Sequence, residues 1–225
     1  ELYRMSLQQG TKPQKLPSTP EQAFMPSYSG DGQWITFVTW HPKGGHIWKT
    51  RADGSGQPQR LTQTKGYYTE PKFTPGDDQI VAIRASQYEY LQSGQERQAD
   101  LIKLSANGGA ADVIYPASGI SGPHFSKEND RVYMHSGAGI TSIRLDGSDK
   151  RSHVAVKGNG FYSATGPVPA RDSRISPDGK WVLAIARNQL LLAAVTRVAN
   201  NALVVHVTAA QVPSKPVAKV GADYF

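Results

Sequence analysis

One turn-and-strand pattern occurs four times in this chain, and it constrains the fold more than any other feature. Each copy has an apolar residue, a serine or threonine, a polar turn cluster and a short apolar run. The copies begin, at spacings of 45, 52 and 50 residues, with Tyr28, Phe73, Phe125 and Ile175. Their apolar runs are rich in β-branched and aromatic residues and are too short for helices. The repeat therefore predicts an all-β fold built from similar units.

A second strand pattern follows three of these copies and ends in an Asp-Gly or Asn-Gly turn. Its copies occupy residues 47–54, 101–108 and 140–147. Residues 2–10 are a further copy whose preceding half is missing. Such turns need φ > 0, which Gly and Asn supply at low cost, and they join antiparallel strands. A short last strand follows, as at residues 58–62 and 111–114.

One unit is then four short antiparallel strands, and this pattern is typical of a β-propeller blade. A single four-stranded sheet cannot bury both of its faces, so blades stack radially and share apolar faces. The expected fold class is all-β, a β-propeller section with about 4–5 blades. We expect a partial blade at residues 1–20, blades at 21–65, 66–116 and 117–165, and an irregular blade at 166–225. The aromatic residues expected in the blade cores are Trp34, Phe37, Trp48, Phe73, Phe125 and Trp181.

Two arrangements of the chain ends are compatible with this pattern. In the irregular blade we expect a third strand at residues 189–195, an extra apolar segment at 201–208 and an outer strand at 216–220. The ring either closes by pairing residues 2–16 with C-terminal strands, or the chain is a section of a larger propeller. We favour a section of a larger propeller. Ring closure would have to complete the partial blade at residues 1–20, and the chain lacks the second strand of that blade.

The charge balance and the composition exclude several classes of protein. The chain carries 25 Lys and Arg against 18 Asp and Glu, a net charge of +7. Its longest basic run is only Lys150-Arg151, whereas nucleic-acid binding needs a focused basic patch, so we expect no nucleic-acid partner. No run of about 18 apolar residues occurs, so we expect no membrane span. The absence of cysteine excludes a disulfide framework and a cysteine nucleophile.

The sequence contains none of the common catalytic or cofactor motifs. The six histidines form neither His-x-His nor His-Glu-x-x-His, and no Gly-x-Ser-x-Gly or phosphate loop occurs. We therefore assign no catalytic residue, no metal ligand and no cofactor to this chain, although whether the protein is an enzyme stays open. Four aspartates of the repeats are expected to be turn residues, not acids or ligands: Asp31, Asp53, Asp146 and Asp178.

Candidate ligand contacts lie where inner-strand ends and inter-blade loops of a propeller meet its central channel. Three loops are notable, at residues 64–71, 85–99 and 158–174. In the first loop, Tyr67, Tyr68 and Glu70 could stack on and hydrogen-bond a peptide or a sugar. His124 and Arg174 are expected on inner strands, facing the channel. The candidate binding residues are Tyr67, Tyr68, Glu70, His124, Arg171, Asp172 and Arg174. For each, the alternative is a solvated loop position or a local salt bridge.

These repeats resemble a known family. Residues 176–181, with the sequence Ser-Pro-Asp-Gly-Lys-Trp, are similar to the WD-type repeat of the TolB-like β-propellers. The other copies are degenerate, with Gly30 in place of the proline in the first and Lys-Glu-Asn-Asp at 127–130 in the third. The resemblance covers the chain from residue 1 to about residue 195. Members of this group include periplasmic TolB, propeller domains of prolyl-oligopeptidase-type and dipeptidyl-peptidase-type enzymes, and propeller regions of some secreted amidohydrolases.

Five further sequence segments most resemble the propeller regions of the amidohydrolase-related group. They are residues 45–49, 66–71, 122–125, 142–147 and 221–225. That resemblance implies a non-catalytic propeller that acts as scaffold, substrate gate or docking surface for a larger exported hydrolase. Any metal would then belong to a hydrolase domain outside this chain.

The partners implied are missing blades or the hydrolase domain of the same protein, and a protein or peptide at the channel mouth. The alternatives are a TolB-type periplasmic protein-binding module, the propeller of a prolyl-oligopeptidase-like enzyme, and an enzyme active in its own channel. The implied location is the bacterial periplasm or the exterior. The chain does not start with Met and has no signal peptide, so we expect that whatever preceded it was removed.

Overall fold

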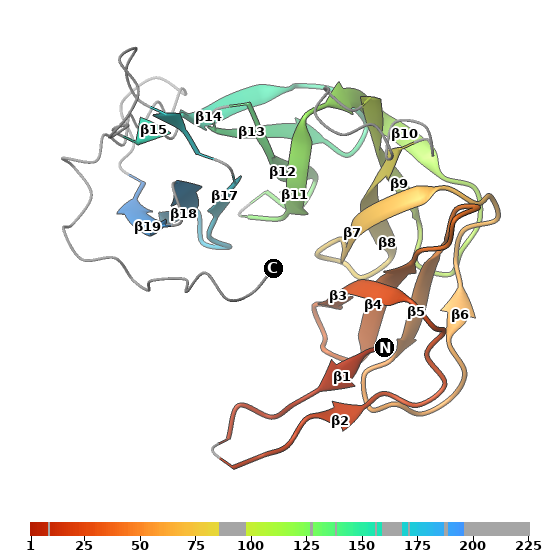
Figure 1. Cartoon of the computed structure of the whole chain (residues 1–225). Helices are drawn as coiled ribbons and strands as arrows, with labels where there is room; N and C mark the ends of the chain where they lie inside the picture. Colours follow the sequence, from red (N-terminus) through yellow and green to blue (C-terminus); the bar gives the residue numbers. More distant parts are fainter. Residues whose placement is uncertain are drawn as a thin grey trace. The chain divides into compact units, whose positions relative to one another are not determined.

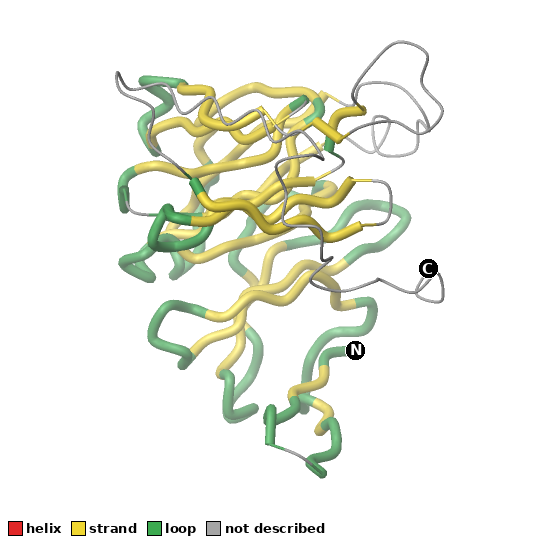
Figure 2. The backbone as a smooth tube through the Cα atoms, turned by 90° about the vertical axis from the view of Figure 1, so that its left-hand side faces the viewer, coloured by secondary structure: helices red, strands yellow, loops and turns green. Residues whose placement is uncertain are grey.

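The structure is a computed structural model that describes residues 1–8, 10–85, 98–126, 128–137, 139–155, 157–158, 168–170, 172–186 and 189–195. All regular secondary structure in these residues is β-strand, arranged in six antiparallel sheets (Figures 1 and 2). The all-β prediction is confirmed. Within the described part of the chain, no helix is long and apolar enough to cross a bilayer. The chain divides into two compact units, Glu1–Gly119 and Ile120–Phe225, which we describe one at a time.

The first unit contains one two-stranded sheet and two four-stranded sheets. A partial blade consists of β1 (Tyr3–Arg4) and β2 (Gln14–Lys15). Blade 1 consists of β3 (Ala23–Tyr28), β4 (Trp34–Thr39), β5 (Ile47–Arg51) and β6 (Gln59–Arg60). Blade 2 consists of β7 (Tyr67–Phe73), β8 (Gln79–Ala85), β9 (Gln98–Ser105) and β10 (Asp112–Ser118). In both blades each strand pairs with the next one along the chain, as a meander.

The second unit repeats this order. Blade 3 consists of β11 (Ile120–His124), β12 (Arg131–Ser136), β13 (Gly139–Arg144) and β14 (Arg151–Ala155). A short ladder pairs β15 (Lys157–Gly158) with β16 (Val168–Pro169). Blade 4 consists, in its described part, of β17 (Asp172–Ile175), β18 (Trp181–Ala186) and β19 (Gln189–Ala194). The expected segments at 201–208 and 216–220 lie outside the described residues.

The repeated Ser/Thr-turn cluster closes the hairpin between the first two strands of a blade. In blade 1 the Ser29 hydroxyl donates to Asp31 Oδ1 at 2.6 Å and accepts the Trp34 N–H at 2.9 Å. Ser176 makes the same two contacts in blade 4, to Asp178 and from Trp181. These hydrogen bonds hold the pKa of the Asp31 and Asp178 carboxyls below the ordinary value, the serine hydroxyl being the main cause. Both aspartates are turn residues, as predicted.

Neighbouring blades within a unit share apolar faces, which is why no single sheet has to bury both faces alone. In the first unit one cluster joins Val38, Ile47 and Leu61 of blade 1 to Tyr68, Phe73, Ile80, Ala82, Ile102 and Leu104 of blade 2. In the second unit a cluster joins Tyr133 and Ile140 of blade 3 to Ile175, Val182 and Ala184 of blade 4.

The aromatic positions of the repeat are not equally buried. Phe37 and Phe73 are core residues, as predicted. Trp34, Trp48 and Phe125 are only partly buried. The prediction for Trp181 is wrong, because this side chain remains 46% exposed on blade 4.

Candidate functional site

The first strand of each blade is the inner strand of a propeller, and three of these strands share one irregularity. Their pairing shifts register at the same place in the repeat, in β3, β7 and β11. The residue inside the shift has positive φ in each case, 51° at Met25, 51° at Glu70 and 66° at Gly122, and a proline follows it. Proline has no N–H to donate, so it is tolerated on an edge strand. A bulge of this kind redirects the side chains beside it.

In the first unit, the redirected side chains connect adjacent inner strands. The Glu70 backbone N–H lies 3.3 Å from Met25 Sδ, and Lys72 Nζ donates to Ser27 Oγ at 3.1 Å. Equivalent repeat positions of β3 and β7 are therefore in direct contact. Glu70 and Lys72 are both half-buried.

The two candidate tyrosines of the first unit lie in a strand and not in a loop. The loop expected at residues 64–71 becomes β7 from Tyr67 onward, because Tyr67 and Tyr68 pair with Ala85 and Arg84 of β8. Both rings are buried, and their hydroxyls donate to backbone carbonyls of Pro42 and Thr64 at 3.1 and 2.9 Å. Burial raises the pKa of Tyr68. In this structure both tyrosines pack in the blade, and a ligand contact for them stays a prediction.

In the second unit, His124 is locked between two blades by both of its ring nitrogens. The Ile175 N–H donates to Nε2 at 2.9 Å, so Nε2 is the acceptor and carries no proton. The other nitrogen, Nδ1, lies 2.7 Å from the Gly122 carbonyl and therefore donates to it. These two bonds select the neutral tautomer with the proton on Nδ1. His124 thus acts as a brace between β11 and β17.

Arg174 and Asp172 lie beside this brace on β17. Arg174 Nη2 donates to Asp172 Oδ2 at 3.0 Å, and both side chains are about one-third exposed. The guanidinium covers Gly122 so closely that a Cβ on that glycine would lie 2.0 Å from Arg174 Cζ. A side chain at position 122 would displace the guanidinium, so the glycine leaves the room that Arg174 occupies. The structure thus brings together His124, Asp172 and Arg174, whereas Arg171 lies outside the described residues.

A buried pair next to these residues was not predicted. His135 Nδ1 lies 2.8 Å from Ser173 Oγ, and both residues are almost completely buried. Burial lowers the pKa of His135, and Asp172 and Arg174 act on it in opposite directions. The sequence did contain a signal for this pair. Side chains alternate between the two faces of a strand, so Ser173 is expected on the face of β17 opposite to Asp172 and Arg174.

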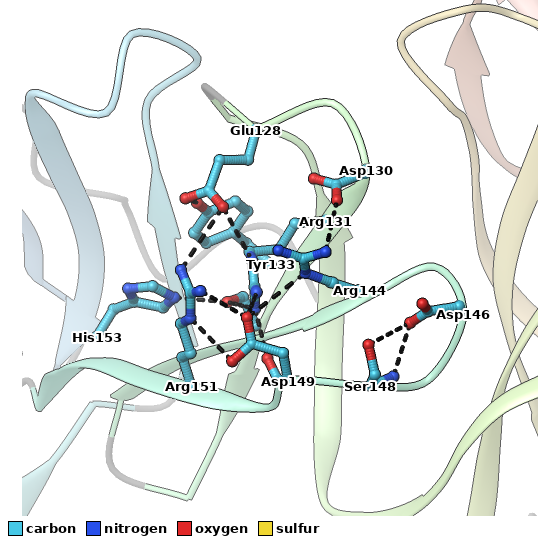
Figure 3. A network of polar contacts seen from close by, with 11 residues as sticks. Glu128, Asp130, Arg131, Tyr133, Arg144, Asp146, Ser148, Asp149, Arg151 and His153 are labelled. Atoms are coloured by element: carbon cyan, nitrogen blue, oxygen red, sulfur yellow. Dashed lines mark hydrogen bonds and ion pairs between the residues drawn. The ribbon is translucent and has the colours of Figure 1, made fainter. Parts of the chain in front are cut away.

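A larger polar network holds the outer part of blade 3 (Figure 3). The Arg131 side chain is fully buried and donates to Ser142 Oγ at 3.1 Å and to the Asp149 carbonyl at 2.7 Å. Its guanidinium also pairs with the carboxylates of Asp149 and Glu128. Arg151 bonds the Asp149 carboxylate too, and these guanidiniums hold the pKa of Asp149 below its ordinary value, Arg151 most strongly.

His153 completes this network on the side of Ser142. Its Nε2 is hydrogen-bonded to Ser142 Oγ, and its ring lies 5.1 Å from that of Tyr133, measured between centroids. Burial lowers the pKa of His153, and Arg131 lowers it further. The network therefore contains an imidazole of lowered pKa beside a buried guanidinium. Across the described ranges of the chain, no three His, Asp or Glu side chains form a group that could hold a metal ion.

Comparisons with known proteins place the fold but not the activity. No protein-family model and no curated protein sequence matches this chain. Three similar solved structures are an oligogalacturonate lyase in complex with manganese, a protein assigned as TolB from Agrobacterium tumefaciens, and a puromycin-hydrolyzing peptidase from Mycobacterium tuberculosis.

The three structures resemble this chain to a similar degree, and all three have low sequence identity to it. The lyase has a TM-score of 0.56 at 11% identity, over 78% of this chain and 51% of its own. The TolB has 0.54 at 14%, over 80% and 64%. The peptidase has 0.54 at 15%, over 80% and 31%. The chain thus spans less than two thirds of each of these proteins. The described blades have the fold of a β-propeller section.

Proposed function

We propose that this chain is a non-catalytic propeller domain that serves as scaffold, substrate gate or docking surface of a larger exported hydrolase of the amidohydrolase type. One observation carries the proposal. Arg174 is paired with Asp172 and lies over Gly122, on the inner strand of a blade, with about a third of its side chain exposed. A charged group oriented by an ion pair on an inner strand can retain or reject a ligand without chemistry of its own.

The state of His124 supports a binding role over a catalytic one. Both ring nitrogens are engaged with backbone groups, so the imidazole holds two blades together. A general base would need one nitrogen within reach of a substrate proton. The ligand proposed for this edge is a protein or peptide of the periplasm or the exterior. The other partners proposed are further blades or the hydrolase domain of the same protein, with any metal in that domain.

Two alternative functions have some support from the fold. A TolB-type periplasmic module would bind a separate protein partner, and the similar TolB structure is compatible with this alternative. The propeller of a prolyl-oligopeptidase-like enzyme is the other, in line with the similar peptidase structure. Both differ from the amidohydrolase proposal in the domain or partner protein that accompanies the propeller. The sequence of the encoding gene distinguishes them, because only the amidohydrolase proposal needs a barrel with a His-x-His motif.

The 225-residue chain is expected to show no amidase turnover with added zinc. The physical reason is that the hydrolytic step is assigned to another domain of the protein. The measurement is release of product from amide substrates by the purified chain, with and without zinc. Turnover that survives a second, independent purification would contradict the scaffold role.

In the full-length natural protein, Arg174→Ala is expected to change KM for extended substrates about tenfold and to leave kcat within about twofold. A charge-assisted contact of this kind is worth about 1.5 kcal/mol, which corresponds to that factor. The matched control is Arg60→Ala on the outer strand β6, which is expected to leave both parameters unchanged. Equal effects of the two substitutions, or a loss confined to kcat, would show that the inner edge does not contact the substrate.

A further inference from the structure

Side chains on the second strand of each blade alternate between two faces, and the repeat fixes which face each one takes. In β18, Val182 and Ala184 are buried against Tyr133 and Ile140 of blade 3. The residues between them, Trp181, Leu183 and Ile185, therefore point to the opposite face of blade 4. We call this the open face, and it also carries their partners on β19, Leu190, Leu192 and Ala194.

In the other blades, the positions equivalent to Leu183 and Ile185 are covered. They are Thr36 and Val38 in β4, Val81 and Ile83 in β8, and Tyr133 and His135 in β12, and all six are buried. Within the first unit, Val38 packs on Ile80 and Ala82 of the following blade. Within the second unit, Tyr133 packs on Val182 and Ala184 of the following blade. The covering element has the same form in both units, a second strand with an aliphatic residue and an alanine two positions apart.

Blade 4 departs from this rule. Leu183 and Ile185 are 36% and 39% exposed, although the repeat places them like buried residues of the other blades, and Trp181 beside them is 46% exposed. Leu190 and Leu192 on the same face are partly exposed as well. A contiguous apolar face of this kind marks a contact surface.

We propose that a further blade of the same polypeptide packs on the open face, through a second strand of the form seen in β8 and β18. The inference rests on the proposed function, in which this chain belongs to a larger protein. A second copy fits the face less well. The matching face of blade 1 is formed by Ile35 and Phe37, and these are already buried against Leu2 and Leu16 of the partial blade.

The first arm of the test uses the 225-residue chain. Leu183→Lys is expected to lower its Tm by less than about 2 °C, because surface substitutions have small effects. Val81→Lys, the matched substitution at the covered position of blade 2, is expected to lower Tm by more than about 10 °C or to prevent folding. A parallel pair, Leu183→Ala and Val81→Ala, gives the same comparison if a lysine variant cannot be purified. If Leu183→Lys destabilises as strongly as Val81→Lys, this chain or a second copy already covers the face, and the proposal is wrong.

The second arm uses the full-length natural protein. There Leu183→Lys is expected to lower Tm by more than about 8 °C, because the additional blade would bury the new charge. Full tolerance of the lysine would overturn the proposal, as would a natural protein without further blade repeats. Sedimentation of the 225-residue chain adds a check, since a dimer that Leu183→Lys separates would assign the face to a second copy. The hydrolase assays are independent, so the open face can be covered by a blade even if the protein lacks amidase activity.

Discussion

Replacing Arg131 by alanine is expected to lower the free energy of unfolding by about 3 to 5 kcal/mol. The side chain is fully buried, and its removal leaves a cavity and takes a partner from Ser142, Glu128 and Asp149 (Figure 3). In thermal unfolding this corresponds to a loss of about 8 to 15 °C in Tm. The measurement is urea unfolding of the 225-residue chain, supported by the Tm.

Two further variants separate the causes of that loss. Arg144→Ala is the matched control, because Arg144 is 44% exposed and contacts Asp130 and Asp149 only at 3.7 and 3.5 Å. We expect it to cost less than about 1 kcal/mol. Arg131→Met keeps most of the buried volume but removes the charge, so it is expected to recover much of the stability. If Arg131→Ala costs no more than Arg144→Ala, the network does not stabilise blade 3.

The second large effect is expected on acidification from pH 7 to pH 5. Burial lowers the pKa of His135 and of His153 below the ordinary value of 6.5. As the pH falls through 6.5, the unfolded chain takes up more protons on the two imidazoles than the folded chain does. Folding stability is therefore lost as the pH falls below 6.5, by at most about 1.4 kcal/mol per pH unit for each histidine. Well above pH 6.5 the two histidines are neutral in the folded and in the unfolded chain, so they add no pH dependence to the folding stability.

The groups that face these histidines support the sign. Arg131 and Arg151 oppose protonation of His153, while Glu128 favours it, and burial has the largest effect. His153→Gln and His135→Gln are expected to make Tm less dependent on pH between 5 and 7. His41→Gln, at an exposed loop position, is the control and should leave that dependence unchanged. Identical pH profiles for the wild type and both variants would exclude His135 and His153 as the cause.

The turn aspartates act in a separate pH range. Hydrogen bonds hold the pKa of Asp31 and Asp178 below the ordinary value of 3.8. Their contribution to stability is present above that value and is lost as the pH falls through the folded-state pKa. A loss between pH 7 and pH 5 is therefore a property of the histidines and not of the turns.

Much of the fold could be predicted because local interactions determine the structure of the repeat. The Ser29 hydroxyl reaches Asp31 and the Trp34 N–H within one hairpin, so a short stretch of sequence sets the turn. The sequence also placed His124, Asp172 and Arg174 near inner strands. It could not show that both nitrogens of His124 would be engaged, since Gly122 and Ile175 lie in different blades.

The candidate tyrosines illustrate why the rest could not be predicted. Tyr67 and Tyr68 follow a glycine and precede a proline, which is typical of a loop. Pairing with β8 makes the segment a strand, and that pairing buries both rings. The burial of Arg131 could not be predicted either, because its partners Ser142 and Asp149 lie 11 and 18 residues further along the chain.

The sequence by itself determined the blade repeat, the all-β class and the turn role of its aspartates, because strand periodicity and turn chemistry act over a few residues. The tertiary structure decided which face of each strand is covered, since this depends on the neighbouring blade. Trp181 shows the difference most clearly. Its place in the repeat predicts a core residue, yet it remains half-exposed on the open face.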